Sequence, residues 1–480
     1  MQLAIDLPLD PTIITDNAWN DILNRISQDG DRHSLKTSSG EKRALGQIFT
    51  PLPMARQLIS LINDFSKNDL NYADPGAGAG ILSAALLSRH AKESLLPPRS
   101  LIAYESDIRL HGQWKSNFSN ICDNLGMDSK NCMLSSDFYQ DAESILTIGS
   151  PLGKEKVSRL ITNPPYKKLA ANSPISLLLK KHGIHAPNHY AAFMALSVEW
   201  LEDNGDLLAI IPRSFFNGAY FKKFRKWLET KVSIEHIVGY ASRSNFGKNV
   251  LQENICLYLT KKSQNSVIRV SLCDHAEANA KYDLLIPKEK IIGEIWKLPS
   301  TPQQLKALTE NESQPETLSS LGVTVNTGAV ETHRSECPNS SQVKVLYSRD
   351  FNANGVITWA ETKKPRTYAL SRAVHRLPCD GSGFVVVKRI TANDGSKHRI
   401  IPTWISRKTT GLNEISFDNH IQVFSHMGKP LNEGAGTALL AFLQGEMANL
   451  CMNAISGTTQ VNINDLNALR YPNIWKKEPA

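Results

Sequence analysis

The sequence predicts a doubly wound α/β domain followed by a second, α+β domain. Between residues 70 and 212, short apolar stretches of strand length alternate with longer stretches of helical periodicity, as in successive βα units. A glycine-rich turn follows the first of these strands. Residues 299–316 are polar and rich in Pro, Gln, Ser and Thr, and beyond them the pattern changes. We therefore expect two domains joined by a linker.

Length and composition exclude several classes of protein. The chain has 480 residues, 41% of them hydrophobic and 21% charged, which is ordinary for globular domains. Its seven cysteines form no Cys-x-x-Cys pair, so they are expected to be reduced thiols and not a zinc site. There is no Walker A lysine loop and no His-Glu-x-x-His. The start lacks a signal-peptide pattern and no apolar run approaches membrane-span length, so we expect a cytoplasmic protein without membrane contact.

Positive charge is concentrated late in the chain. The formal net charge is +8, and residues 341–410 alone carry 13 Lys and Arg against 4 Asp and Glu. Such a local surplus is typical of a surface that binds a polyanion. A solvated basic surface without a partner explains the charge count equally well.

A helix entry follows a weakly patterned extension of about 40 residues. The stretch 46–51 reads Gly-Gln-Ile-Phe-Thr-Pro, in which Thr50 is a natural N-cap and Pro51 a natural first helical residue. Apolar residues recur at helical spacing after it. The backbone N–H groups of a capped helix start can bind an anionic group such as a carboxylate.

The glycine-rich turn predicts a cofactor loop. A short strand, 70–73, leads into Asp-Pro-Gly-Ala-Gly-Ala-Gly and then a helix over 81–91. Alternate glycines let the backbone bend sharply and approach a ligand at a helix start. The dinucleotide fingerprint fails because Ile81 and Ser83 occupy the third-glycine positions, so a nucleoside ligand other than NAD is favoured. The candidate residues are Asp74, Gly76, Gly78 and Gly80.

An acid follows each of the next two predicted strands. Glu105 comes after strand 101–104 and is well placed to accept from both ribose hydroxyls. Asp137 comes after strand 132–135, where it could accept from an adenine amino group while Phe138 packs beside the ring. Each acid alone is more often a helix cap, and their repeated position raises the odds of a nucleoside site.

The fourth strand, 160–162, ends in Asn163, Pro164, Pro165 and Tyr166. Two prolines make a stiff corner at the strand's carboxyl end. An exocyclic amine on an aromatic ring is a poor nucleophile, and two acceptors, the Asn163 side-chain oxygen and the Pro164 carbonyl, could draw it toward a pyramidal nitrogen. Tyr166 could stack on the ring. The alternative is a surface Pro-Pro turn.

The remaining elements complete the two domains. Residues 167–188 are polar, basic and broken by prolines, which suggests a mobile loop over the substrate. Further helices are expected at 190–201, 219–228 and 437–455, and further strands at 205–212, 234–238, 255–260, 321–328 and 384–388.

Taken in order, these motifs resemble the gamma-class DNA adenine-N6 methyltransferases of type II restriction-modification systems. The matching stretches are the helix entry at 46–51, the glycine loop at 74–80, the acids Glu105 and Asp137 and the unaltered Asn-Pro-Pro-Tyr. The resemblance implies a seven-stranded Rossmann-like sheet that binds S-adenosylmethionine and a carboxyl-terminal target-recognition domain. It also places Phe246 against the opposite face of the target base, and residues 456–462 are similar to stretches of such recognition domains.

The resemblance gives the domains and partners that we expect. The expected division is an extension (1–40), a catalytic domain (41–298), a linker (299–317) and a recognition domain (318–480). Duplex DNA is the expected substrate, with a flipped-out adenine as methyl acceptor, a cognate restriction endonuclease as functional partner, no metal, and a monomer or weak dimer. The alternatives are an RNA or protein-glutamine N-methyltransferase and a non-catalytic DNA-specificity subunit.

Overall fold

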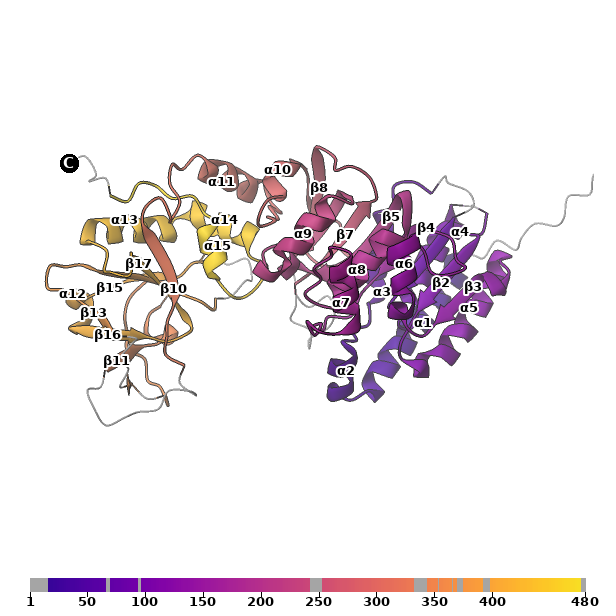
Figure 1. Cartoon of the computed structure of the whole chain (residues 1–480), viewed down its shortest axis with the longest axis horizontal. Coiled ribbons are helices and arrows are strands. Elements are labelled where there is room, and N and C mark those ends of the chain that lie inside the picture. Colours follow the sequence, from indigo (N-terminus) through magenta and orange to yellow (C-terminus); the bar gives the residue numbers. More distant parts are fainter. Residues whose placement is uncertain are drawn as a thin grey trace, which may run out of the picture. The chain divides into compact units, whose positions relative to one another are not determined.

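The computed structural model describes residues 16–65, 70–93, 96–241, 253–331, 343–352, 354–364, 366–368, 374–391 and 398–475, apart from the side chains of residues 43 and 44. These residues form two compact units (Figure 1). The first unit runs to Phe215 and resumes from Tyr220 to Lys288. The second contains Phe216–Ala219 and the described residues from Glu289 onward.

The first unit is built on a nine-stranded sheet with the order β3-β2-β1-β4-β5-β7-β6-β8-β9. The strands from β3 to β5 in this order pair in parallel, and β7 is antiparallel to both of its neighbours. Because the strand order reverses direction at β1, the carboxyl ends of β1 and β4 flank a topological switch point. The strands are β1 (Asn71–Pro75), β2 (Ser100–Tyr104), β3 (Cys132–Ser135), β4 (Val157–Thr162), β5 (Leu201–Pro212), β6 (Ser233–Tyr240), β7 (Asn254–Thr260), β8 (Val267–Cys273) and β9 (Ala280–Pro287).

The predicted α/β class is confirmed, and the predicted sheet of seven strands is extended by two. Strand β8 pairs in parallel with β6, and β9 pairs antiparallel with β8. Exposed residues alternate with buried ones in the first half of β8, and most of β9, the edge strand, is exposed or half-buried. Only a weak alternating pattern marks such strands, which is why the sequence did not reveal them.

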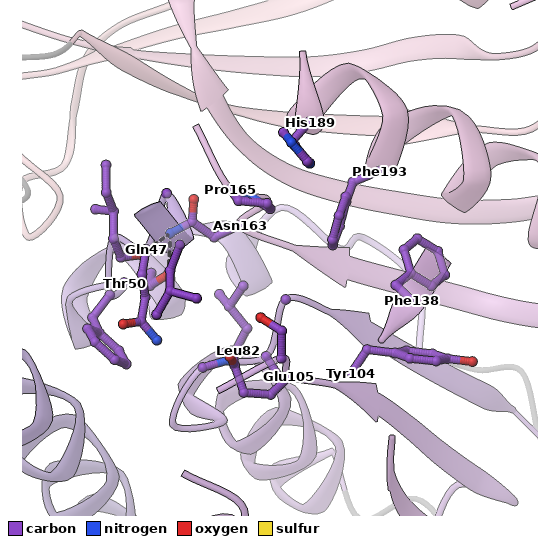
Figure 2. A pocket seen from close by; sticks show the side chains of 18 of the residues that line it. Gln47, Thr50, Leu82, Tyr104, Glu105, Phe138, Asn163, Pro165, His189 and Phe193 are labelled. Carbon is purple, nitrogen blue, oxygen red and sulfur yellow. Dashed lines mark hydrogen bonds between the residues drawn. The ribbon is translucent and has the colours of Figure 1, made fainter. Parts of the chain in front are cut away.

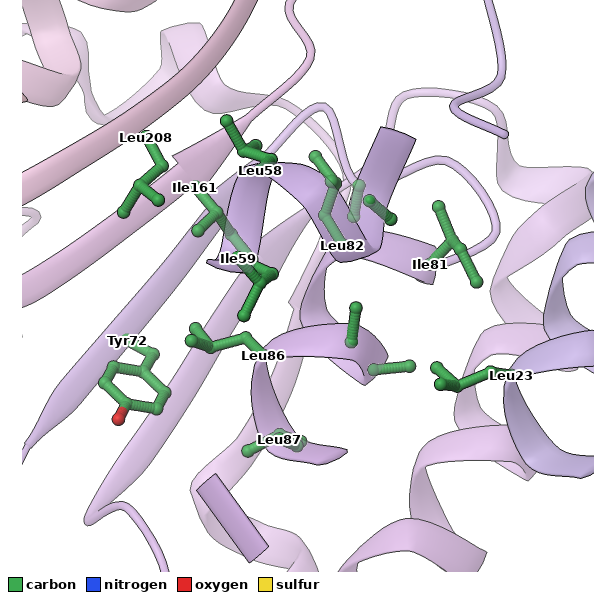
Figure 3. Packing of buried hydrophobic residues seen from close by; sticks show 14 of the residues in the cluster. Leu23, Leu58, Ile59, Tyr72, Ile81, Leu82, Leu86, Leu87, Ile161 and Leu208 are labelled. Atoms are coloured by element: carbon green, nitrogen blue, oxygen red, sulfur yellow. The ribbon is translucent and has the colours of Figure 1, made fainter. Parts of the chain in front are cut away.

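Helices cover both faces of this sheet. One group, α1, α3, α4 and α5, shares a large hydrophobic core with the central strands (Figure 3). A second group, α6, α7 and α8, packs together. The helices of the unit are α1 (Asp16–Lys36), α2 (Ser39–Leu45), α3 (Leu52–Ser60), α4 (Ile81–Lys92), α5 (His111–Leu125), α6 (Ala142–Ile148), α7 (Pro174–Lys181), α8 (His189–Trp200) and α9 (Lys222–Glu229).

Residues 16–36, within the expected extension, form the helix α1, which buries Trp19, Leu23 and Ile26 in the core. One expectation for the first unit is wrong. Residues 167–188 are not a loop without secondary structure, because they contain α7. The Ser173 side chain accepts from the Ser176 N–H and Pro174 occupies the first turn, so this proline starts a helix instead of breaking one.

The second unit contains two four-stranded sheets. One has the order β10 (Val323–Thr327), β17 (Ile421–His426), β14 (Gly383–Lys388) and β15 (Pro402–Ser406), and the other has the order β12 (Thr367–Tyr368), β11 (Val343–Leu346), β16 (Glu414–Phe417) and β13 (His375–Arg376). All of their pairings are antiparallel except that of β11 with β16. Its helices are α10 (Lys288–Ile291), α11 (Pro302–Glu312), α12 (Arg407–Thr410), α13 (Glu433–Gln444), α14 (Glu446–Ile455) and α15 (Ile463–Asn467).

The stretch expected as a linker, 299–317, is part of the second unit. It contains α11, which Thr301 caps and which packs against α14. The single helix expected at 437–455 is two helices, because Gly445 takes an extended conformation between α13 and α14. Across the described residues no single helix meets the length and hydropathy of a membrane span, although this pair, bent by 61°, passes when taken together.

Candidate functional site

A cavity of about 470 Å³ lies at the carboxyl ends of β1, β2, β3 and β4 (Figure 2). This volume is within the usual range for cofactor sites. The walls come from the segment before α3, the glycine loop, the turns after β2, β3 and β4, and the first turns of α8. The lining residues include Gln47, Phe49, Thr50, Gly76, Gly78, Glu105, Asp137, Phe138, Tyr139, Asn163, Pro165, His189 and Phe193.

The glycine loop forms one wall with its backbone. Gly76, Gly78 and Gly80 all have positive φ, a conformation that residues with a Cβ rarely adopt. The N–H groups of Gly76 and Ala77 donate to the Tyr104 carbonyl, each at 2.9 Å, and fix the loop to the end of β2. A Cβ at Gly80 would lie 2.4 Å from the Phe118 ring, so only glycine fits where α4 begins. The loop therefore presents bare backbone to the cavity.

The Glu105 carboxylate is held beside this loop. Its Oε2 accepts from the Gly78 N–H at 2.8 Å and its Oε1 from the Asp107 N–H at 2.7 Å. The residue is only 8% exposed, and burial raises the pKa of its carboxyl, while the two backbone bonds oppose that rise. Because each oxygen can accept further bonds, the carboxylate remains available to hydroxyl groups of a ligand in the cavity.

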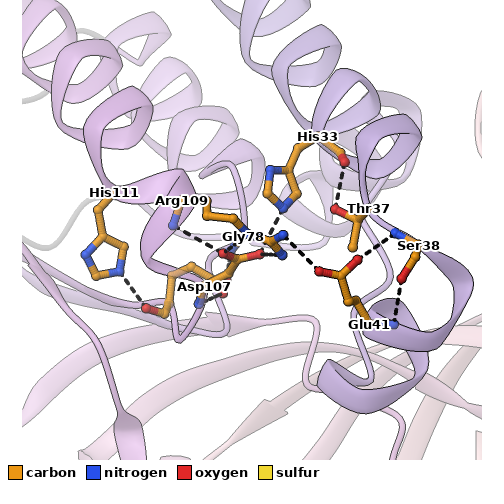
Figure 4. A network of polar contacts seen from close by, with 9 residues as sticks. His33, Thr37, Ser38, Glu41, Gly78, Asp107, Arg109 and His111 are labelled. Atoms are coloured by element: carbon orange, nitrogen blue, oxygen red, sulfur yellow. Dashed lines mark hydrogen bonds and ion pairs between the residues drawn. The ribbon is translucent and has the colours of Figure 1, made fainter.

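Polar contacts connect the amino-terminal helices α1 and α2 to the turn after β2, next to Glu105 (Figure 4). His33 on α1 lies 2.9 Å from an Asp107 oxygen, and Arg109 binds both Asp107 oxygens at 2.7 and 2.8 Å. Arg109 also donates to Glu41 on α2 at 3.3 Å. The hydrogen bonds from Arg109 hold the pKa of Asp107 at about 2. No local pattern in residues 16–45 indicated that α1 and α2 contribute to this site.

An aromatic wall faces the glycine loop. Phe138 lies 5.2 Å from Phe193 and 5.0 Å from Tyr104, measured between ring centroids. Asp137 caps the short helix Phe138–Asp141, because its Oδ1 accepts from the Tyr139 N–H at 2.9 Å. Asp137 is thus a helix cap, as the alternative interpretation predicted, and the residue also lines the cavity. Phe193 and His189 come from α8, whose apolar sequence gave no sign that two side chains face a cavity.

The corner after β4 fixes the orientation of the Asn163 amide. Its Nδ2 donates to the Ile48 carbonyl at 3.0 Å and to the Thr50 hydroxyl at 2.9 Å, which uses both N–H bonds. Its Oδ1 therefore acts as the acceptor, and the Tyr166 hydroxyl donates a hydrogen bond to it at 2.9 Å. Burial raises the pKa of Tyr166 well above its ordinary value, so this hydroxyl stays protonated. No described residue donates to the Pro164 carbonyl.

The contact with Asn163 corrects the expectation for the helix entry. Thr50 is not the N-cap of α3: the helix begins at Leu52, Pro51 is the N-cap, and no side chain bonds the free N–H groups. The Thr50 hydroxyl is occupied by the Asn163 amide instead. The stretch 46–51 therefore acts mainly by orienting Asn163 and by lining the cavity.

The structure brings most of the predicted residues together. Those that line the cavity are Thr50, Gly76, Gly78, Glu105, Asp137, Phe138, Asn163 and Pro165. Those that do not are Pro51, Asp74, Gly80, Pro164 and Tyr166. Asp74 is fully buried at the end of β1 and accepts from the Ser83 hydroxyl at 2.6 Å, so it joins the strand to α4. Phe246 lies outside the described residues.

Gln47 is a cavity residue that the sequence analysis did not select. Both polar atoms of its side chain are buried, and neither has a hydrogen-bond partner among the described residues. A buried amide without partners is costly unless a ligand satisfies it. Among the described residues no group of three His, Cys, Asp or Glu side chains could hold a metal ion.

Comparison with known proteins gives the family. A model described as Eco57I restriction-modification methylase matches residues 92–246. The chain is 30% identical to the type II methyltransferase M.PstI of Providencia stuartii, over 89% of this chain and 87% of that protein. It is 29% identical to M.BsuBI of Bacillus subtilis, over 92% and 91% of the two chains.

Among solved structures, the chain is similar in fold to the type IIG restriction endonuclease BpuSI, with a TM-score of 0.50 and 15% identity. The match covers 95% of this chain and spans 61% of that one. A likeness at this identity shows the fold alone, whereas the similarity to M.PstI extends along nearly the whole of both proteins. The chain belongs to the type II methyltransferases of restriction-modification systems.

Proposed function

We propose that this protein is a site-specific DNA methyltransferase that transfers a methyl group from S-adenosylmethionine to the N6 amino group of an adenine. The observation that carries the proposal is the fixed Asn163 amide at the wall of the cavity. With both of its N–H bonds occupied by Ile48 and Thr50, it offers only an oxygen to a substrate amine. Membership of the type II methyltransferase family supports methyl transfer as the reaction.

The cavity residues fit S-adenosylmethionine. Gly76 and Gly78 line the cavity without a Cβ, and their positive φ is one that other residues rarely adopt, so the backbone can approach a ligand closely. Glu105 would accept from the ribose hydroxyls. The rings of Phe138 and Phe193 would pack beside the adenine of the cofactor, with Asp137 accepting from its amino group. Gln47 would bond the amino-acid portion of the cofactor, which satisfies its otherwise unpartnered amide.

The chain contributes positioning and electrostatics to the reaction. The cofactor supplies a methyl group already activated by its sulfonium, so a strong general base is not needed. Asn163 Oδ1 and the Pro164 carbonyl would accept the two N–H bonds of the target amine and direct its lone pair toward the methyl group. A preorganised pair of acceptors needs no reorganisation during transfer, which is the usual source of large rate effects.

Adenine in a duplex cannot present its amino group, so the base must be flipped out, at a cost of a few kcal/mol. Stacking on Tyr166 would offset part of this cost by about 1–3 kcal/mol. The Tyr166 ring is already anchored, because its hydroxyl bonds both Asn163 Oδ1 and the Ile210 carbonyl. We assign the opposite face of the base to Phe246. The second unit would read the DNA sequence, and a cognate endonuclease would be the functional partner.

Modification-sensitive sequencing of genomic DNA tests the proposal. A methylation-deficient host expressing this chain is compared with the same host expressing Asn163→Ala. We expect N6-methyladenine at one short motif, present with the wild-type protein and absent with the variant. If the wild-type protein is folded and binds S-adenosylmethionine but modifies no DNA motif, the acceptor is RNA or protein and the proposal is wrong.

A further inference from the structure

A cleft of about 830 Å³ lies in the second unit. It is formed by the segment that leaves β11 and returns as β12. Four cations and one carboxylate line it, together with a tryptophan. These residues are Arg349, Trp359, Glu361, Lys363, Lys364 and Arg366.

One lining cation, the half-buried Arg366, forms an ion pair with the buried Asp350. Arg366 donates to Asp350 Oδ2 at 2.6 Å and also bonds the Ala360 carbonyl. Asp350 is fully buried and accepts the Tyr347 N–H at 2.8 Å. Arg366 is therefore committed to the fold, because without it the Asp350 carboxylate would be buried and unpaired.

The other cations differ from Arg366. Arg349 and Lys363 are exposed and Lys364 is half-buried, and no acidic side chain among the described residues pairs with any of the three. A cluster of like charges without acidic partners repels itself, so it favours an anion in the cleft. The single lining carboxylate, Glu361, leaves a positive excess.

Aromatic rings hold one lysine of the cleft, Lys364, and a neighbouring lysine, Lys344, that does not line it. The Lys344 ammonium lies 3.7 Å from the Trp359 ring centroid, and the Lys364 ammonium lies 5.2 Å from that of Tyr347. Such cation–π contacts restrict a long side chain without neutralising its charge. Trp359 has a φ of 45°, which a bulky residue rarely adopts, so the surrounding contacts impose this conformation. The cleft is thus a built arrangement of cations.

We infer that this cleft binds the phosphodiester backbone of the substrate DNA duplex, with Arg349, Lys363 and Lys364 each contacting phosphate oxygens. The inference rests on the proposed function, which makes duplex DNA the substrate. Phosphate contacts fix the register of a protein on DNA but carry no sequence information. The cleft would therefore set affinity and position and leave the choice of sequence to other residues.

The test measures the affinity for a fluorescently labelled mixed-sequence duplex across a salt series, for the full-length protein. Each of Arg349→Gln, Lys363→Gln and Lys364→Gln should lower the affinity and reduce the slope of log affinity against log salt by about 0.9, and the triple variant by about three times that. Lys429→Gln is the matched control, because Lys429 is an exposed lysine of the same unit outside the cleft. Arg366 is kept, since Asp350 needs its partner.

Methylation at subsaturating DNA is measured beside the binding; it should fall in the cleft variants with their affinity and stay at the wild-type rate in Lys429→Gln. An unchanged slope in the folded triple variant would overturn the inference, as would an equal change in Lys429→Gln. If the wild-type protein methylates DNA but the cleft variants bind DNA as the wild-type protein does, the inference about the cleft is wrong and the proposed function stands. Salt-dependent duplex binding that needs the cleft, without N6-methyladenine formation by the wild-type protein, would refute the proposed function instead.

Discussion

The cavity of the first unit and the cleft of the second differ in how far their polar side chains are buried and hydrogen-bonded. In the cavity, Glu105 and Asn163 are almost fully buried, and most of their hydrogen-bonding capacity is used by backbone groups and neighbouring side chains. In the cleft, Arg349 and Lys363 are exposed and Lys364 is half-buried, and none of the three has an acidic partner among the described residues. Arg366, the fourth cation of the cleft, is the one that pairs with an acid, Asp350.

On the proposed function and the inferred role of the cleft, the difference would follow from what each region has to bind. A reacting amine must be held in one geometry, so its acceptors are fixed in advance by bonds that exclude other orientations. A phosphate backbone offers the same charge at every step, so exposed cations suffice and their effect is screened by salt. Substitutions in the cavity should therefore cause large and salt-insensitive losses, and those in the cleft smaller losses that salt removes.

The largest effect is expected at Asn163. Replacing it with alanine removes the acceptor and should lower kcat by about 10²–10³, as removal of one preorganised catalytic hydrogen bond does elsewhere. The dissociation constant of S-adenosylmethionine should change by less than about threefold. Thr50→Val should give a smaller loss of kcat, since it removes only one of the bonds that orient the amide. Single-turnover kinetics and calorimetry separate the two quantities, and near-normal kcat in Asn163→Ala would contradict the assignment.

The next largest effect is expected at Glu105. Glu105→Gln keeps the shape but loses charge-assisted bonds, which are worth about 1.5–3 kcal/mol, so the cofactor should bind about 10–100 times more weakly. Glu93→Gln is the matched control, because Glu93 is an exposed acid at the end of α4. The loss should be the same at low and high salt. Unaltered cofactor affinity in folded Glu105→Gln would show that this buried carboxylate does not hold the ribose.

The elements predicted correctly from sequence are those whose signal is local. Strand β3 and the start of α4 lie at the predicted residues, since apolar runs and glycines constrain their own backbone. The positions after β2, β3 and β4 followed from the parallel order of the strands, which brings their ends to one edge. The Asn-Pro-Pro-Tyr corner was recognisable because two prolines fix its conformation.

The features that were missed depend on contacts between distant residues. Thr50 and Asn163 are 113 residues apart in the chain, and nothing in either local sequence shows that they bond each other. Phe193 and His189 were hidden in an apolar helix, and Gln47 is distinguished only by lacking a partner. In the second unit the basic excess was evident from composition, but the convergence of Arg349, Lys363 and Lys364 on one cleft required the fold.

The smallest effect is expected at Asp74, and it tests whether a buried carboxyl of the first unit makes stability depend on pH while an exposed cation of the cleft does not. Burial raises the pKa of Asp74 to about 7, and its Oδ1 has no partner among the described residues. The folded state therefore holds a proton that the unfolded chain releases near pH 4, so the free energy of unfolding should fall as the pH rises from about 4 to about 7.

Asp74→Asn removes this titration and should make the protein more stable than wild type above pH 7, seen as an unfolding temperature a few degrees higher, with no gain near pH 4. Thermal unfolding of both proteins at several pH values measures the difference. Lys363→Gln, in the cleft, should leave the pH profile unaltered, because its charge is exposed in both states. If both variants shift the profile equally, or if Asp74→Asn is destabilised at every pH, then the contrast between buried charges in the cavity region and solvated charges in the cleft does not hold.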